Sequence, residues 1–151
     1  MPASKSPIVE FKGKPALYIC SSETGLSALI ENSKKISKGA DLLLLFDYSE
    51  RAMARALPAY VNATIRFSDG SARSKSMQVE MLMLVCGTMN IGKALRDCGA
   101  KDNDKFLVFA SSEGLFSKFA KANGIKRIRG VTLRLDPEIT GNVAITELLN
   151  D

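Results

Sequence analysis

The chain has 151 residues, a hydrophobic fraction of 46% and a formal net charge of +5, which fits a single folded domain over residues 1–151. Its apolar stretches are all shorter than the roughly 20 residues of a membrane span, and the first residues lack the apolar core of a signal peptide. Histidine is absent, so the commonest general base and the preferred ligand of catalytic zinc are missing. We expect a cytoplasmic, non-enzymatic protein without a cofactor or a metal.

The remaining reactive side chains form no pattern typical of a catalytic site. Cys20, Cys86 and Cys98 lack CxxC spacing and stand among apolar residues, so we expect small core residues in a reducing compartment. The acidic residues are spread along the chain without paired spacing. Glu80 is the exception, because it is alone in an apolar segment. It is either a functional acid or, as we favour, a side chain that caps a backbone group or reaches solvent.

In the first half, a strand is predicted at residues 16–20, an amphipathic helix at 22–38 and, at 42–46, either a short apolar strand or the lead-in to a helix. A long helix follows at 48–67. Pro58 lies inside this helix, and proline removes one helical hydrogen bond at a cost of about 3 kcal/mol. We therefore expect a kink or a break at Pro58.

The central segment, residues 77–100, allows two incompatible interpretations. Gly87, Gly92 and Lys93 have the spacing of a phosphate-binding loop, but Ala94 stands where that motif needs a hydroxyl for Mg²⁺. The alternative is a turn between two helices. The apolar run 77–86 then forms a buried helix, Asn90 caps a second helix, and Gly99 ends it in a left-handed conformation. The apolar stripe of this second helix is Ile91, Ala94, Leu95 and Cys98, and the helical interpretation is favoured.

In the second half, a buried strand is predicted at residues 106–110 and a helix at 114–123 that ends at Gly124. Residues 131–135 alternate like an edge strand. Asp136 is expected to cap a final helix with Pro137 in its first position. Strands in ones and twos between helices of unequal length predict an α+β fold, in which several helices pack on a small mixed β-sheet.

Positive charge is unevenly distributed. No acidic residue occurs between Gly114 and Leu135, whereas that stretch contains six basic residues, and a second basic group surrounds the serine-rich segment 68–76. Concentrated positive charge attracts phosphate groups through counterion release. A basic cluster is also compatible with an ordinary solvated surface.

The central segment resembles the signature of a known family, the kinase-binding subunit of the KEOPS (EKC) complex, also called the PRPK-binding protein family. The resemblance covers an acidic residue in an apolar turn, a glycine, a polar linker and a short helix with a closing glycine, followed by the strand at 106–110. The matching residues are Glu80, Leu82, Leu84, Gly87, Asn90, Ile91, Ala94, Leu95 and Gly99. Upstream, residues 40–42 and 52–56 match more weakly, and the length suits an archaeal member.

The resemblance implies an adaptor that binds the small kinase-like ATPase subunit of the complex and helps recruit tRNA, through its CCA end, for threonylcarbamoyladenosine modification. It implies a kinase interface on the final helix, at Ile145, Leu148 and Leu149. Archaeal members commonly carry Arg-Gln before the signature isoleucine, where this chain has Met89 and Asn90. The candidates for tRNA binding are therefore the other cations nearby, Arg73, Lys75, Lys93 and Arg96. The alternatives are a standalone RNA-binding module and a nucleotide-binding protein.

Overall fold

The computed structural model describes residues 8–10, 14–38, 41–101, 104–134 and 144–146. Four antiparallel strands form its main sheet in the order β3–β4–β2–β5. They are β2 (Ala16–Ser22), β3 (Leu43–Asp47), β4 (Phe106–Ala110) and β5 (Ile125–Gly130). A separate parallel pair joins β1 (Ile8–Glu10) to β6 (Ala144–Thr146). The predicted α+β class is confirmed. The strands expected in one mixed sheet are divided between the antiparallel sheet and the parallel pair.

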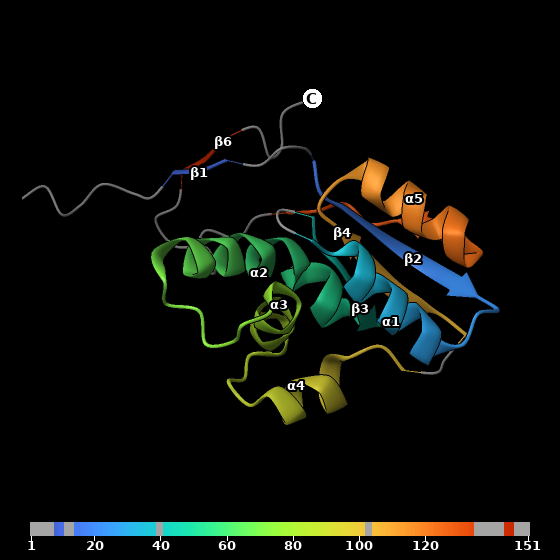
Figure 1. The fold of residues 1–151 in the computed structure, drawn as a ribbon, viewed down its shortest axis with the longest axis horizontal. Helices are drawn as coiled ribbons and strands as arrows, with labels where there is room; N and C mark the ends of the chain where they lie inside the picture. Colours follow the sequence, from blue (N-terminus) through green and yellow to red (C-terminus); the bar gives the residue numbers. More distant parts are fainter. Residues whose placement is uncertain (1–7, 11–13, 39–40, 102–103, 135–143, 147–151) are drawn as a thin grey trace, which may run out of the picture.

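Helices cover both faces of the main sheet (Figure 1). Because side chains alternate along a strand, Leu17 and Ile19 of β2 face one side, towards α2 (Glu50–Asp69) and α3 (Met77–Cys86). Tyr18 and Cys20 face the other side, towards α1 (Leu26–Ile36) and α5 (Glu113–Asn123). The sheet is thus buried on both faces, as its near-continuous apolar strands require.

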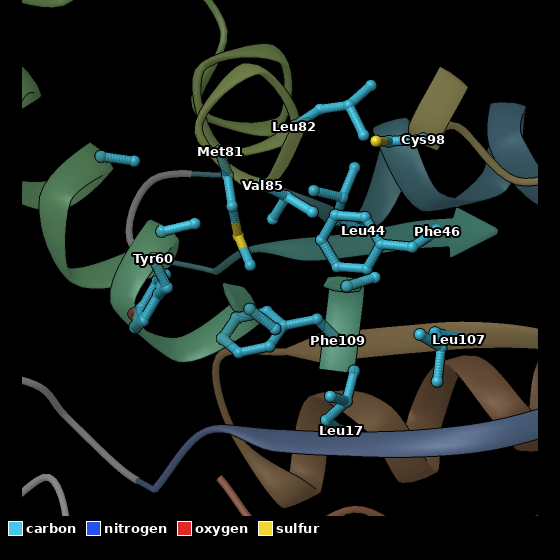
Figure 2. Packing of buried hydrophobic residues seen from close by; sticks show 14 of the residues in the cluster. Leu17, Leu44, Phe46, Tyr60, Met81, Leu82, Val85, Cys98, Leu107 and Phe109 are labelled. Atoms are coloured by element: carbon cyan, nitrogen blue, oxygen red, sulfur yellow. The ribbon is translucent and has the colours of Figure 1, made fainter. Parts of the chain in front are cut away.

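The helices α2 and α3 pack together on the first face, and α4 (Ile91–Cys98) lies beyond α3, away from the sheet (Figure 1). In Figure 2, Met81 and Val85 of α3 point towards the sheet, where Leu44 and Phe109 lie. All four side chains are buried. The predicted helix pair 77–86 and 91–98 is confirmed.

Polar caps define where the helices begin. The side chains of Ser49, Ser76, Asn90 and Ser112 accept hydrogen bonds from first-turn N–H groups of α2, α3, α4 and α5. At the other end, Gly87 and Gly124 adopt the left-handed conformation, as expected for Gly124. The left-handed conformation predicted for Gly99 is wrong, because its φ is −65° and its ψ is 153°.

Two predicted elements differ from the structure. Of the kink or break expected at Pro58, the break is absent, because helix α2 continues through the proline over 20 residues. Burial of Ala56, Leu57, Tyr60 and Val61 on both sides of the proline outweighs one lost hydrogen bond. The strand at this edge of the sheet is β5, at Ile125–Gly130, whereas residues 131–134 are not in a strand. The pairing of β5 with β2 shifts register at Ile19 and Cys20, so Ile128 has no partner and the alternating pattern is interrupted.

The predicted final helix is wrong at residues 144–146, because Ile145 lies in β6 and aligns with Val9 of β1. The expected helical stripe of Ile145, Leu148 and Leu149 is therefore wrong at Ile145, which is in a strand. Asp136, Pro137, Leu148 and Leu149 lie outside the described residues. Within the described ranges, no helix is both long enough and apolar enough to cross a bilayer.

Candidate nucleic-acid and partner interface

The segment between α3 and α4 is a turn between two helices and not a phosphate-binding loop. A phosphate-binding loop follows a strand, whereas Gly87 follows helix α3 and has a left-handed φ of 75°. The side chain of Asn90 accepts the Lys93 N–H at 2.9 Å, so a first-turn donor of α4 is already bonded within the chain. The segment can position surface side chains on α4, but it does not have the strand–loop–helix geometry of a nucleotide cradle.

Helix α4 buries only half of its predicted apolar stripe. Ala94 and Cys98 are buried, as expected, but 45% of Ile91 and 54% of Leu95 are exposed. Met89, in the turn before the helix, is 67% exposed. These three side chains are half of the six large apolar residues that are exposed in the described part of the chain. Clustered apolar exposure of this kind marks an interaction surface more than a scattered distribution would.

The four predicted tRNA-binding residues are all exposed, but they form two groups. Arg73 and Lys75 precede the first residue of α3. Lys93 and Arg96 lie on α4, which follows the last residue of α3. The two pairs therefore precede and follow α3, a helix of 10 residues about 15 Å long. Among the described residues, neither pair forms an ion pair with a carboxylate.

Two arginines of α2, absent from the predicted candidates, lie next to the helix pair α3 and α4. Arg55 Nη1 donates to the carbonyl oxygen of Val85 at 3.4 Å and lies beside Gly87. Arg51, one helical turn earlier, lies beside the thiol of Cys98. Their spacing of four residues on one helix is a detectable signal. Only the packing of α2 against α3 brings Arg55 next to the turn before α4 and Arg51 next to Cys98 of α4.

The cysteines and Glu80 have structural roles, as predicted. Cys20, Cys86 and Cys98 are buried and free. Burial, reinforced by Cys86, raises the pKa of Cys98 to about 11 despite the nearby Arg51. Burial also raises the pKa of Cys20 to about 12. Both thiols are therefore protonated at neutral pH and poorly nucleophilic.

Glu80 is fully buried and caps backbone groups in the loop between α2 and α3. Its Oε1 accepts the N–H groups of Arg73 and Ser74, both at 2.9 Å. The preference for a capping role is confirmed. This carboxylate thereby fixes the backbone of the loop that presents the Arg73 and Lys75 side chains to solvent.

Comparison of the sequence with models of known protein families finds no match, and comparison with curated proteins finds none either. The surface around α4 combines exposed apolar side chains with four cations, Arg51, Arg55, Lys93 and Arg96. We name this set, with Met89, Ile91 and Leu95, the α4 surface.

Proposed function

We propose that this chain is a non-catalytic accessory subunit of a KEOPS-type complex. In this role it binds the small kinase-like ATPase subunit and helps recruit tRNA for threonylcarbamoyladenosine modification. The observation that carries the proposal is the α4 surface, because it lies within the segment that resembles the family signature and has the mixed chemistry of a docking surface. The chemistry of the modification would belong to another subunit.

The cations of the α4 surface support contact with RNA. Arg51, Lys93 and Arg96 are exposed, and Arg55 is half-buried. Cations that contact phosphates release counterions, which makes binding favourable and dependent on salt. The apolar side chains of Met89 and Ile91 would contact unstacked bases, such as those of a single-stranded tRNA end. Arg73 and Lys75, at the other end of α3, would extend the contact to a neighbouring part of the backbone.

The exposed apolar residues also support contact with a protein. Interfaces between proteins are enriched in methionine and arginine and depleted in lysine at their centre. Met89 and Arg51 match the first part of this description, while Lys93 would lie at the rim. The kinase contact implied at Leu148 and Leu149 belongs to this proposal as well.

A salt titration of tRNA binding tests the RNA role. We expect the affinity to fall steeply between about 50 and 200 mM salt. The double variant Lys93→Gln/Arg96→Gln should weaken binding and reduce the slope of log K against log salt by roughly 1 to 2. The matched control is Lys118→Gln/Lys121→Gln, which removes two exposed charges from α5, on the opposite face of the sheet. Equal losses in both variants would show diffuse attraction and would refute an RNA site on α4.

Affinity capture from a native extract tests the partner. The tagged chain should retain a small kinase-like ATPase, identified by mass spectrometry, and Leu148→Asp should abolish that capture while the circular dichroism spectrum stays unchanged. Steep salt-dependent tRNA binding in the absence of any captured kinase would support a standalone RNA-binding module instead.

A further inference from the structure

A cavity of about 900 Å³ lies between α1, the edge of β3, the first half of α3 and the end of α4. Its walls are mostly apolar and include Ile30, Leu44, Phe67, Val79 and Leu95. The volume is within the range of pockets that enclose small organic ligands, which are typically apolar with a few placed polar groups. None of the four cations of the α4 surface lines this cavity. Leu95 is the one residue that the cavity shares with that surface.

The wall formed by β3 is held in place by side-chain hydrogen bonds. Ser37 Oγ accepts the Leu43 N–H at 2.9 Å, and its hydroxyl donates to the Ser33 carbonyl at 2.8 Å, with the Leu43 carbonyl 3.2 Å away. Gln78 Nε2 donates to the Leu43 carbonyl and lies 3.4 Å from Ser37 Oγ. The outer edge of β3 is therefore already bonded at Leu43.

Further along the same strand, Phe46 forms a bridge with Gly99. A peptide strand that adds to a sheet needs a row of free N–H and C=O groups. Because β3 is occupied at two points, the cavity does not suit strand addition. Its rigid wall suits a small molecule that uses apolar contact.

Of the described residues that line the cavity, three are charged. Lys34 stands in the last turn of α1 and Lys75 just before α3, and both side chains are exposed. Asp41 is the single carboxylate among the lining residues that the structure describes. Two ammonium groups against one carboxylate give the opening an excess of positive charge, which favours an anionic head group and disfavours a cationic one.

We propose that this cavity binds an amphipathic monoanion, a small molecule with an apolar body and a single carboxylate or sulfonate group. The apolar body would lie against Val79, Leu44 and Leu95, and the anionic group would be at the opening, near Lys34 and Lys75. The proposal concerns a different ligand from the function proposed above, and the two sites share only Lys75 and Leu95 among the residues named for them.

Calorimetric titration of the full chain with decanoate, below its micellar concentration, tests the proposal. Decanoate should bind saturably at one site, decan-1-ol more weakly, and decyltrimethylammonium most weakly. Equal binding of all three probes, or no saturable binding of decanoate, would overturn the proposal.

Variants locate the site. Val79→Trp fills the cavity and should abolish decanoate binding; Ala100→Phe, on the opposite wall, serves if Val79→Trp does not fold. Lys34→Gln should weaken decanoate binding roughly two- to fivefold, with no effect on decanol. Lys35→Gln is the matched control, since Lys35 is exposed but does not line the cavity.

Unchanged decanoate binding in a folded cavity-filling variant would place the ligand elsewhere and refute the site. Binding of tRNA is measured on the same cavity-filling variant and should match the unmodified chain, so a failure of one proposal is distinguishable from a failure of the other.

Discussion

The carboxylate of Glu80 accepts a hydrogen bond from Arg66 Nη1 at 2.8 Å, which ties α3 to the last turn of α2. Glu80 is fully buried, whereas 36% of the Arg66 side chain is exposed. The ion pair is therefore partly open to solvent. The other carboxylate oxygen of Glu80 is the acceptor for the two backbone N–H groups of the loop. The central acid of the family-like segment is thus the organising residue of the loop between α2 and α3.

Replacement of Glu80 should destabilise the fold. Glu80→Ala leaves two N–H groups without their partner and should lower the free energy of unfolding by about 3 kcal/mol. Glu80→Gln keeps one oxygen for those N–H groups but turns an amide towards Arg66, so we expect a smaller loss. Arg66→Ala is the control and should cost less than Glu80→Ala, because its side chain is more solvated. Urea unfolding measures all three, and a cost for Arg66→Ala equal to that for Glu80→Ala would assign the effect to the ion pair.

The two glycines of α4 should respond in opposite directions to alanine. A Cβ on Gly99 would lie 2.5 Å from the carbonyl oxygen of Leu95, a backbone atom that cannot move alone. Gly99→Ala should therefore lower the free energy of unfolding by about 2 kcal/mol. A Cβ on Gly92 would meet side-chain atoms only, at 3.4 and 3.5 Å. Gly92→Ala should stabilise α4 by roughly 0.5–1 kcal/mol. Thermal unfolding of both variants is the measurement, and a shift of the same sign in both would contradict the close approach at Gly99.

The stability of the fold should decline in alkaline solution. Burial, aided by the charge of Asp41, raises the pKa of Tyr60 from 10.0 to about 12, and burial raises that of Cys20 from 9.0 to about 12. Between these values the unfolded chain loses protons that the folded chain keeps, so the free energy of unfolding falls as the pH rises. Their contribution is complete below about pH 9 and is lost as the pH approaches about 12.

Tyrosine variants test this dependence by urea unfolding at several pH values. Tyr60→Phe should flatten the decline between about pH 10 and 12. Tyr48→Phe, at a 41% exposed tyrosine, is the control and should leave the decline unchanged. If Tyr48→Phe has the same effect as Tyr60→Phe, burial of Tyr60 is not the cause.

The exposed apolar residues of α4 should matter for binding and little for folding. Ile91→Ser and Leu95→Ser remove side chains that are about half exposed, so each should change the free energy of unfolding by about 0.5 kcal/mol or less. The same variants should reduce capture of the kinase-like subunit. Ala94→Ser, at a fully buried position on the same helix, should instead lower stability. A large loss of stability in Leu95→Ser would make Leu95 a core residue.

Several features could be predicted from local chemistry. The strands at residues 42–46 and 106–110 are short apolar runs, and Asn90 caps α4 through a contact between neighbouring residues. Two features could not. Ile128 interrupts the alternation of β5, and this is visible only from its pairing with β2. Arg51 and Arg55 join the candidate site because α2 packs against α3, which no spacing around residues 87–99 indicates.

The sequence by itself determined the α+β class, the helix pair around Gly87 and the burial of the three cysteines, because periodicity, caps and apolar runs act over a few neighbouring residues. Only the tertiary structure decided which side of α4 faces solvent, where Glu80 places its carboxylate and which cations share a surface. All three features depend on contacts between segments that are distant along the chain. The same contacts decided how much of the predicted apolar stripe of α4 is left available for a partner.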